Sequence, residues 1–513
     1  MSEASAHIDG TRLTVQSLQT LVKSKKIKTV ISPKALKSLK NQHASLMARV
    51  KSEPVYGVNT GFGPLANRVL PKSELINLQY NLIRSHAAGV GAALPERFVR
   101  SAMIVRLNTL CRGNSAVTPA LVKHLCACIN AHITPVVYEH GAVGTSGDLV
   151  QLAHIALGLI GEGNVYAKSG TKSSAVALKA AHLKPYALQP KEGLSLINGT
   201  AMMTAIGAEV VWHTQRILDF AILNGALALE LVGAYGDSLD PKLHALRPHP
   251  GQIEIARRLR EAIKGSRLIR NRSHIRARVD AAEVTQLSEV IQQVYSLRCI
   301  PQIIGPLYDS TERAKQIVEV ELNAVTDNPI YDPNSKMFLH GGNFHGDYIA
   351  VALDQLKIPL TKLILLTERR INFFLNEHTN RSFPPFLNLK TPGLNLALQG
   401  LQFVATSTAA HSQTAAFPHT VHSIPTNADN QDLVSMGTDA ALLAHTVVKN
   451  AYILLAIEMT VLAQAVDVLK VKTKLSAKTR DHYSLIRTYI RTVTEDRSLQ
   501  PELEKLIFAL QEN

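Results

Sequence analysis

Apolar residues recur every three or four positions through much of this chain, which is the period of one face of an α-helix. The pattern is clear between about residues 75 and 135, where no strand-like alternation of any length occurs. From Asp354 to Phe374 the apolar positions step by three and four along one face of a long helix, which Pro359 is expected to kink. The sequence therefore predicts a mainly α-helical protein.

The segment from Asp439 to Leu469 is apolar on most sides, which indicates a helix inside a bundle, roughly 45 Å long at the helical rise per residue. Lys449, Glu458 and Asp467 interrupt it, and a helix that crosses a bilayer would not readily accept them. We therefore expect a core helix and no association with a membrane. Its partners along the bundle are expected near residues 200–235, 350–375 and 395–415.

Short strands are expected at two places. One is Pro54 to Gly63, and the other is Ile330 to Leu339, where Asp332-Pro333-Asn334 would turn a hairpin. The fold class predicted is mainly α, with a long-helix bundle core over residues 201–513. A smaller N-terminal domain, rich in glycine loops, is expected over residues 1–200.

The 513 residues are enough for one large core or two closely packed domains, and 46% hydrophobic and 19% charged residues are typical of a globular enzyme. Four cysteines in so long a chain do not make a disulfide framework. The N-terminus, MSEASAHIDG, has no basic region followed by an apolar core. No secretory signal is therefore expected, and a cytoplasmic location follows.

The net charge of +15 raises the question of nucleic-acid binding. The densest basic stretch runs from Arg257 to Arg278, but no aromatic residue is interleaved there for base stacking, and Glu261 breaks it. A solvated helical face or a subunit contact is favoured, and nucleic acid is not expected as a partner.

A glycine-rich turn directly precedes an apolar helix in the segment from His140 to Gly163. In one interpretation, Ser146 or Asp148 caps the helix that follows. In a second, the nitrogen of Gly147 attacks the carbonyl carbon of Thr145, and Ser146 loses its hydroxyl as water, giving a methylidene-imidazolone ring. That chemistry needs a β-leaving group on the middle residue and a third residue that can bend back, which serine and glycine provide.

The sequence GTSGDLVQLAH, which contains this tripeptide, resembles the prosthetic-group loop of the histidine, phenylalanine and tyrosine ammonia-lyases and related aminomutases. The resemblance implies that Thr145, Ser146 and Gly147 form the methylidene-imidazolone (MIO) autocatalytically and that no metal is needed. That family usually has Ala-Ser-Gly, so Thr145 is a departure. Because the first side chain stays outside the ring, the change should alter packing more than it prevents cyclisation.

Further segments resemble the same family and keep its order along the chain. YGVNTGFG resembles the loop of the catalytic tyrosine and implies Tyr56 as the base that removes the substrate's β-proton. QQVYSLRCIPQIIG resembles a segment that places Gln292, Tyr295 and Arg298 in the active site. There, Arg298 would hold the substrate carboxylate through a two-pronged contact.

Four other segments complete the resemblance: LINGT, NAVTDNP, GGNFHGD and SIPTNADNQDLVSMG. They imply Asn198 as a contact of the ring, Asn328 and Phe344 as active-site residues, and Asn430 and Gln431 at the positions nearest the ring. Each segment alone could be an ordinary turn or helix cap. All seven segments, however, keep the family's order over about 380 residues.

The resemblance implies that the amine of a bound aromatic amino acid, or in an older proposal its ring, adds to the exocyclic carbon of the prosthetic group. Tyr56 then takes the β-proton and ammonia leaves, giving a trans-α,β-unsaturated acid. The resemblance also implies a homotetramer whose active sites draw residues from three subunits.

Ser85-His86, in NLIRSHAAGVG, stands where the family selects its substrate ring. His86 can form a hydrogen bond with a phenol hydroxyl or an imidazole nitrogen, whereas phenylalanine would leave it unsatisfied at a cost of about 1 to 3 kcal/mol. The alternative is a packed histidine with a backbone partner. Histidine ammonia-lyases have a glutamate at the position that matches His411, so the imidazole there favours tyrosine, although His411 also differs from the tyrosine enzymes.

The sequence thus favours a tyrosine ammonia-lyase that forms trans-p-coumarate. A histidine ammonia-lyase that forms trans-urocanate is the second hypothesis, and a 2,3-aminomutase, in which ammonia adds back at the β-carbon, is the third. A helical assembly or nucleic-acid-binding protein that only keeps the fold is the non-enzyme alternative. It predicts an unmodified Ser146 and salt-sensitive binding to polynucleotide.

Overall fold

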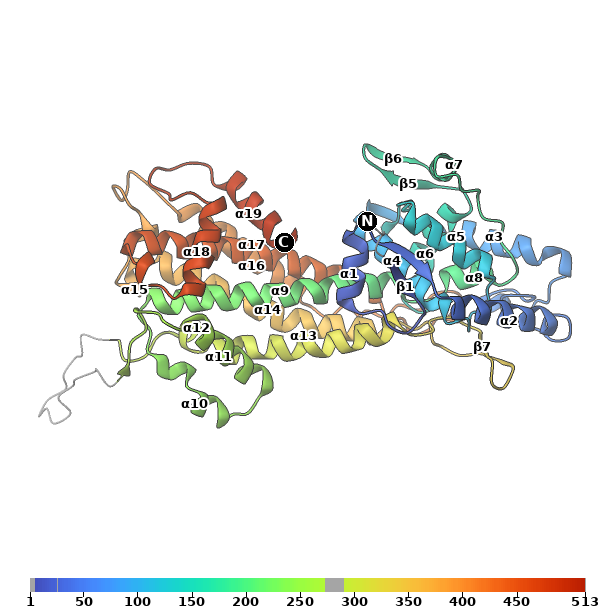
Figure 1. Cartoon of the computed structure of the whole chain (residues 1–513), viewed down its shortest axis with the longest axis horizontal. Helices are drawn as coiled ribbons and strands as arrows, with labels where there is room; N and C mark the ends of the chain where they lie inside the picture. The colour runs from blue at the N-terminus through green and yellow to red at the C-terminus, as the bar shows by residue number, and fades with distance from the viewer. Residues whose placement is uncertain (1–4, 25, 273–289, 513) are drawn as a thin grey trace, which may run out of the picture. The chain divides into compact units, whose positions relative to one another are not determined.

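The computed structural model describes residues 5–24, 26–272 and 290–512 of the chain (Figure 1). Most of these residues are helical, and the strands form four two-stranded sheets. Arg276 and Arg278, at the end of the basic stretch, lie outside the described residues. The prediction of a mainly α-helical chain with long helices is confirmed.

The chain folds into two compact units, each assembled from three segments. The first unit contains Met1–Trp212, Ala314–Asp354 and Pro418–His445, and the second contains His213–Arg313, Gln355–Phe417 and Thr446–Asn513. Four long helices contribute residues to both units: α9 (Ala201–Leu231), α13 (Ile300–Leu322), α14 (Asp347–Leu375) and α17 (Gly437–Leu469). The domain boundary expected near residue 200 stays a prediction, and that residue immediately precedes α9.

The four sheets belong to the first unit. Strand β1 (Ser5–Ile8) pairs with β2 (Lys28–Ile31) in parallel, and three pairs are antiparallel: β3 (Val90–Ala93) with β4 (Tyr138–His140), β5 (Asn164–Ala167) with β6 (Gly170–Ser173), and β7 (Ile330–Asp332) with β8 (Met337–Leu339). The last pair confirms the predicted hairpin.

The strand expected from Pro54 to Gly63 is wrong. This segment is a loop whose β-pairing is an isolated bridge between Thr60 and Val69. Gly63 has a φ of +51°, which a strand does not adopt. The side chain of Asn59 binds three backbone groups of the preceding turn, so side-chain hydrogen bonds hold the loop in place of a ladder.

The helices confined to the first unit are α1 (Val15–Lys23), α2 (Pro33–Arg49), α3 (Leu75–His86), α4 (Glu96–Cys111), α5 (Pro119–Asn130), α6 (Leu149–Leu159), α7 (Ser174–Ala180) and α8 (Glu192–Ile197). The helices predicted between residues 75 and 135 are confirmed. Helix α4 is buried at every position from Phe98 to Cys111, so it forms the centre of this unit. Helices α3, α6 and α8 pack against one another and position the site described below.

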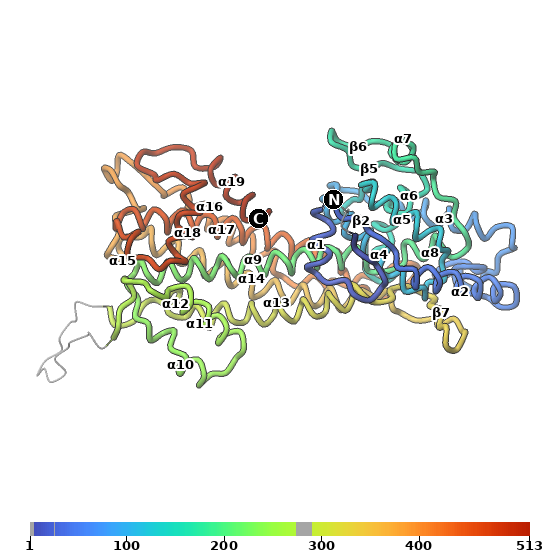
Figure 2. Tube along the Cα trace, in the orientation of Figure 1, coloured from blue at the N-terminus to red at the C-terminus, as the bar shows by residue number. Residues whose placement is uncertain are grey.

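The helices confined to the second unit are α10 (Pro241–Ala245), α11 (Pro250–Ala262), α12 (Tyr295–Arg298), α15 (Glu377–Asn380), α16 (Gln399–Ala415), α18 (Ala477–Tyr489) and α19 (Gln500–Glu512). In this unit α14, α16 and α17 run alongside one another (Figure 2), joined by hydrogen bonds such as that from Thr406 to Glu368. The long helices predicted from the apolar pattern are confirmed, and Pro359 lies inside α14. Helix α13 was not predicted, because Gly305 and Pro306 interrupt its apolar period.

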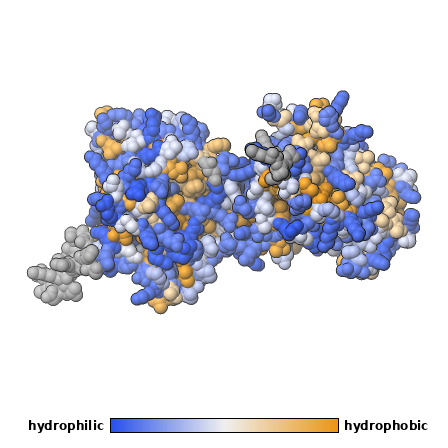
Figure 3. Space-filling model, viewed as in Figure 1, coloured by the Kyte–Doolittle hydropathy of each residue, from blue (hydrophilic) through white to orange (hydrophobic). Residues whose placement is uncertain are grey.

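Helix α17 is long and apolar enough to cross a membrane by length and composition, but 78% of its most apolar window is buried inside the protein. Its charged Glu458 pairs with Arg370 of α14 at 2.5 Å, with both side chains at most 1% exposed. A buried charge of this kind requires a close partner. The helix is therefore a bundle core, whereas the outer face in Figure 3 is largely hydrophilic with scattered apolar patches.

Candidate active site

A cavity of about 1230 Å³ in the first unit collects residues from widely separated parts of the chain. Most of the residues that the motifs implicated line its wall: Tyr56, His86, Thr145, Ser146, Asn198, Asn328, Phe344, Asn430 and Gln431. Loops supply most of them, and α3 supplies His86 as its last residue. The structure thus brings these segments together around one space, with Gly147 next to Ser146 in the chain.

Gly147 occupies a position that only glycine can fill. Its φ is +71°, and a Cβ atom there would lie 1.9 Å from the carbonyl oxygen of Gly199. Two hydrogen bonds join these segments: Gly199 N–H donates to the Ser146 carbonyl oxygen at 3.2 Å, and Asp148 N–H donates to the Gly199 carbonyl oxygen at 2.9 Å. A serine followed by a tightly turned glycine fits the backbone cyclisation that the tripeptide suggested.

Thr145, the departure from the family's usual alanine, forms a hydrogen bond that alanine could not. Its hydroxyl donates to Oε1 of Gln431 at 2.6 Å, and Nε2 of Gln431 donates to Oγ of Ser146 at 3.2 Å. Thr145 is buried. The threonine therefore holds Gln431 in the orientation that contacts the serine.

Asp148 does not cap its own helix, so that local interpretation is wrong. Helix α6 begins at Leu149 without a side-chain cap. The Asp148 carboxylate instead accepts hydrogen bonds from the backbone N–H groups of Met202 and Met203, at 2.8 and 3.0 Å, and one from the Thr438 hydroxyl. It therefore caps the first turn of α9. Burial raises the pKa of this carboxyl to about 6, although these hydrogen bonds oppose the shift.

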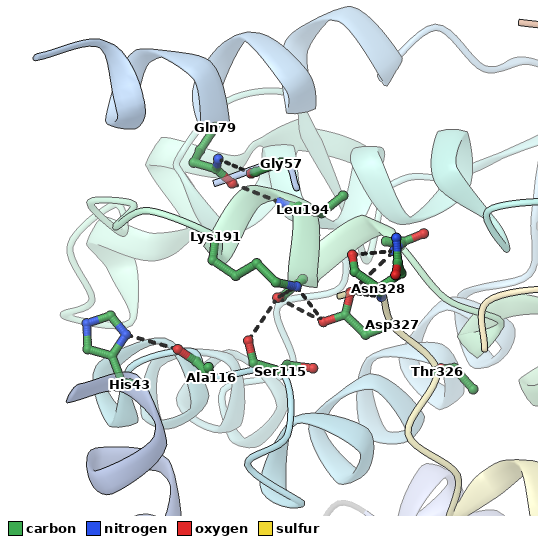
Figure 4. A network of polar contacts seen from close by, with 12 residues as sticks. His43, Gly57, Gln79, Ser115, Ala116, Lys191, Leu194, Thr326, Asp327 and Asn328 are labelled. Atoms are coloured by element: carbon green, nitrogen blue, oxygen red, sulfur yellow. Dashed lines mark hydrogen bonds and ion pairs between the residues drawn. The ribbon is translucent and has the colours of Figure 1, made fainter. Parts of the chain in front are cut away.

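Tyr56 lies on a loop whose fold is fixed by glycines and by α3. A Cβ atom on Gly57 would lie 2.5 Å from Leu194 of α8. Gln79 of α3 fastens the loop to α8, since its Nε2 donates to the Gly57 carbonyl oxygen at 3.1 Å and its Oε1 accepts from Leu194 N–H at 3.0 Å (Figure 4). The N–H of Gly63 donates to the Tyr56 phenol oxygen at 3.0 Å, so this oxygen has a backbone donor beside it.

His86 has the backbone partner that the alternative interpretation required. Its Nδ1 lies 2.9 Å from the carbonyl oxygen of Leu82. A carbonyl can only accept, so Nδ1 carries the proton, and Nε2 is left as the acceptor of the neutral ring. Because His86 also lines the cavity, this contact orients the imidazole and fixes its tautomer.

Asn198 and Asn328 are held by a buried acid. Asn198 Nδ2 donates to Asp327 Oδ1 at 3.3 Å and to the Asn328 carbonyl oxygen at 3.2 Å. Asn328 Oδ1 accepts from Gly341 N–H at 2.9 Å. Asn198 therefore does not use its side chain to cap α9, a task that Asp148 performs.

The sequence motifs did not identify two buried cations whose charges act on Asp327. Lys191 forms an ion pair with Asp327 at 2.9 Å, with both side chains fully buried, and Arg106 of α4 is 1% exposed (Figure 4 shows Lys191 reaching Asp327). Burial would raise the pKa of the Asp327 carboxyl, but the charges of Lys191 and Arg106 hold it below its usual value. An arginine among the apolar residues of α4 was the one hint available.

Four predicted residues belong to the second unit and do not line this cavity: Gln292, Tyr295, Arg298 and His411. The Arg298 guanidinium lies 4.7 Å from the centre of the Tyr295 ring, and its Nε donates to the Gln293 carbonyl oxygen at 3.0 Å. Gln292 and Arg298 line a separate cavity of about 350 Å³ within that unit. Tyr295 is 69% exposed, which is unusual for a large aromatic side chain.

His411 is exposed on α16, and its Nδ1 lies 3.2 Å from Nδ2 of Asn450 on α17. The amide nitrogen donates, so Nδ1 is the acceptor and Nε2 carries the proton of the neutral ring. Over the described parts of the chain, no group of three or more His, Cys, Asp or Glu side chains could hold a metal ion.

Comparison with known proteins identifies the family. The sequence model of the family described as aromatic amino acid lyase matches residues 13–488. A histidine ammonia-lyase of Geobacillus kaustophilus is 38% identical over 458 residues, which cover 89% of this chain and 88% of that protein. A tyrosine ammonia-lyase of Cupriavidus metallidurans is 36% identical over 513 residues, which cover 99% of this chain and 96% of that protein.

The fold is shared with a solved relative. The crystal structure of tyrosine aminomutase from Streptomyces globisporus matches with a TM-score of 0.95 and 35% identity, over 99% of this chain and 97% of that chain. This likeness confirms the predicted fold class, and the sequence relatives confirm the predicted enzyme class, a carbon–nitrogen lyase. The chain belongs to the aromatic amino acid lyase family.

Proposed function

We propose that the chain is an ammonia-lyase that eliminates ammonia from L-tyrosine and releases trans-p-coumarate. The observation that carries the proposal is the wall of one cavity, which Ser146, Tyr56 and His86 line together. Ser146 offers the site of an electrophile, Tyr56 offers a base, and His86 offers a hydrogen-bond acceptor for the substrate ring. A small aromatic amino acid is the partner, and the chemistry requires no metal.

Thr145, Ser146 and Gly147 are proposed to form the methylidene-imidazolone from their own backbone. The Gly147 nitrogen bonds to the Thr145 carbonyl carbon, whose oxygen leaves as water with the amide hydrogens of Gly147 and Ser146. Ser146 then loses its Cα proton and its hydroxyl as a second water. The ring supplies an electrophilic carbon that no ordinary side chain offers. The left-handed turn at Gly147 supports this step, because it presents the short bend that cyclisation needs.

Tyr56 is proposed to accept the β-proton of the substrate. A phenolate oxygen is stabilised by nearby donors, and the Gly63 N–H already donates to this oxygen at 3.0 Å. The Phe62 ring packs edge-on beside Tyr56 with centroids 6.3 Å apart, and Gln79 anchors the loop. These contacts restrict the base to one position, which lowers the entropic cost of reaching the transition state.

His86 is proposed to select the substrate ring. With the proton on Nδ1 held by Leu82, Nε2 accepts a hydrogen bond from a phenol hydroxyl. Phenylalanine has no such donor and would leave Nε2 unsatisfied, at a cost of about 1 to 3 kcal/mol. Asn198, Asn328, Phe344 and Gln431 complete the wall around the substrate.

Gln292, Tyr295, Arg298 and His411 are proposed to reach the cavity from other copies of the chain in a homotetramer. The exposure of Tyr295 supports this arrangement, because an aromatic side chain at an interface is buried on assembly. Arg298 would then bind the substrate carboxylate through a two-pronged contact, and Tyr295 would join it at the reacting centre. A cytoplasmic location completes the proposal and is supported by the four free thiols.

Histidine is the second candidate substrate, because an imidazole N–H could donate to Nε2 of His86 in the same way as a phenol. The identity to histidine ammonia-lyases is similar to that with the tyrosine enzyme. An aminomutase is the third candidate, and the likeness to the Streptomyces structure supports keeping it. It would differ in returning ammonia to the β-carbon.

The deciding experiment incubates the purified protein separately with L-Tyr, L-His and L-Phe and follows the ultraviolet absorbance of the unsaturated acids. Release of trans-p-coumarate from L-Tyr, with slower reaction of the other two, is expected. A faster reaction with L-His would replace tyrosine by histidine, and a β-amino acid product would establish the aminomutase. An intact mass without a deficit of two water molecules would leave only the helical scaffold.

A further inference from the structure

Arg106 of α4 donates hydrogen bonds to backbone carbonyl groups, one of which belongs to Asn198, the residue before Gly199, which bridges to Gly147. Its Nε donates to the Ser195 carbonyl oxygen at 2.8 Å, Nη1 donates to the Thr326 carbonyl oxygen at 2.7 Å, and Nη2 donates to the Asn198 carbonyl oxygen at 2.9 Å. Nη2 also donates to the Ser195 carbonyl oxygen, and Nη1 donates to the Thr326 hydroxyl at 3.4 Å. Three carbonyl oxygens and one hydroxyl therefore take up the donors of a guanidinium that is 1% exposed.

Asp327, a buried acid whose charge acts on Arg106, forms its ion pair with another cation. Asp327 pairs with Lys191 at 2.9 Å, so the two charges satisfy each other directly. Burial lowers the pKa of Arg106, while Asp327 and Asp148 raise it from a distance, and arginine stays protonated in proteins. Arg106 is therefore a permanent positive charge whose hydrogen bonds end on peptide groups and, in one case, on the Thr326 hydroxyl.

One of these peptide groups connects Arg106 to the loop. The carbonyl of Asn198 and the N–H of Gly199 belong to the same planar amide. The carbonyl accepts from Arg106 at 2.9 Å, and the N–H donates to the Ser146 carbonyl oxygen at 3.2 Å. Withdrawal of electrons at the amide oxygen strengthens its N–H as a donor, since hydrogen bonds in a chain polarise one another.

Gly199 makes this close approach possible. Its φ is +159°, and a Cβ atom on it would lie 2.4 Å from Nη1 of Arg106 and 2.5 Å from the Thr326 carbonyl oxygen. The same glycine forms the bridge with Gly147. The arrangement thus needs a residue without a side chain between the guanidinium and the loop.

We propose that Arg106 is a positioning residue that stabilises negative charge on the Ser146 carbonyl oxygen through the Asn198–Gly199 peptide, an inference that rests on the proposed function. Charge develops on this oxygen when Ser146 loses its Cα proton, a double bond forms to Cβ, and the hydroxyl leaves, with proton and hydroxide departing as water. Negative charge develops on the same oxygen again when a nucleophile bonds to this Cβ atom. A donor placed in advance lowers the barrier of both steps.

The alternative is that Arg106 only fastens the segments around Ser195 and Thr326. Two variants distinguish the role of the charge from a purely structural role. R106Q keeps hydrogen-bond donors without a charge, and R106K keeps the charge. Arg100 provides the matched control. It lies on the same helix, is 7% exposed and donates from Nη1 to the Ile129 carbonyl oxygen at 2.8 Å, away from the loop.

The experiment compares full-length wild type, R106Q, R106K, R100Q and S146A. Circular dichroism checks the fold, intact mass counts the waters lost, and the rate of cyanide addition, seen as a gain of one HCN, reports the electrophile without the substrate reaction. S146A should show neither the mass deficit of two waters nor the addition of cyanide. We expect wild type, R106K and R100Q to lack two waters.

R106Q is expected to retain a population that lacks only one water, and its mature fraction should add cyanide about tenfold more slowly than R100Q, a smaller effect than removal of a direct donor. Complete maturation and an equal cyanide rate in R106Q would overturn the role of Arg106 and leave the proposed function standing. No deficit in wild type would overturn the proposed function itself. Should R106Q not fold, R106K decides: full maturation supports a role for charge, and a folded R106K that lacks only one water contradicts it.

Discussion

The segments around Ser146 and the segment around Arg298 carry motifs of one family, yet within a single chain they line different cavities. The loops of Tyr56, Ser146 and Gln431 converge on one cavity within the first unit. The Arg298 segment belongs to the second unit and lines a different cavity. Motif order along a sequence therefore predicts which residues take part in the chemistry, but it does not predict whether they act within one copy of the chain.

Two buried arginines, Arg370 and Arg106, differ in the partners that they find. In the second unit Arg370 of α14 pairs directly with Glu458 of α17. In the first unit Arg106 donates to backbone carbonyls beside the tripeptide. A charge that lacks a direct acid partner is costly to bury, so its place next to a predicted reacting loop points to a role in chemistry.

The largest effect is expected from S146A, which tests the role of the Ser146 loop in the first unit. Without a hydroxyl to lose, the loop cannot complete the double bond, and turnover should fall to the level of the uncatalysed reaction. The fold should persist, because the Ser146 hydroxyl accepts a single bond, from Gln431. Ultraviolet assays and circular dichroism check both points, and activity near that of wild type would refute the assignment of the prosthetic group.

The second-largest effect is expected from R298A, which tests the role of the Arg298 segment of the second unit. Loss of a bidentate contact to the substrate carboxylate should reduce kcat/KM by about 10² to 10³-fold. If the sites are shared between copies, co-expression of R298A with S146A should restore activity, because some sites would receive an intact Ser146 from one copy and an intact Arg298 from another. The assay compares the mixture with each variant alone, and a mixture no more active than its components would place both residues in the same copy.

The long helices could be predicted from the sequence, because a buried helix must carry apolar residues at its own period. Helix α17 shows that signal over its whole length, whereas Pro306 hides it in α13, which packing stabilises nonetheless. Tyr56 and Ser146 carried motif signals. Arg106 could not be found in the same way, because its partners are mainly backbone carbonyls up to 220 residues away, and backbone acceptors have no residue signature.

A pH effect on stability is expected from His482 of the second unit. Burial lowers the pKa of His482 to about 4, and its Nε2 donates to Asn224 Oδ1 at 2.8 Å. The unfolded state binds the proton near pH 6.5, so stability is present above that pH and is lost as pH falls toward 4, by about 3 kcal/mol. Asp148 of the first unit has the opposite sign, since its raised pKa costs stability as pH rises from about 4 to 6.

The measurement is thermal or urea unfolding of wild type and H482Q between pH 4 and pH 7. Glutamine keeps a donor for Asn224 without a titrating group, so the stability of wild type relative to H482Q should decrease by about 3 kcal/mol toward pH 4. Parallel curves for the two proteins would show that His482 does not titrate in this range. The variant lies outside the proposed active site and should leave turnover at neutral pH unchanged.

The smallest effect is expected from T145A, which restores the residue that the family usually has. The change removes the hydrogen bond to Gln431 and should cost about 1 kcal/mol of stability, seen as a lower Tm. Since the side chain stays outside the ring, T145A should still lose two waters, with turnover within about threefold of wild type. Gln431 would then be free to rotate away from Ser146, so Q431A combined with T145A should lower the Tm no further than Q431A alone. An additive loss in the double variant would contradict the coupling of these two side chains through a hydrogen bond that alanine could not form.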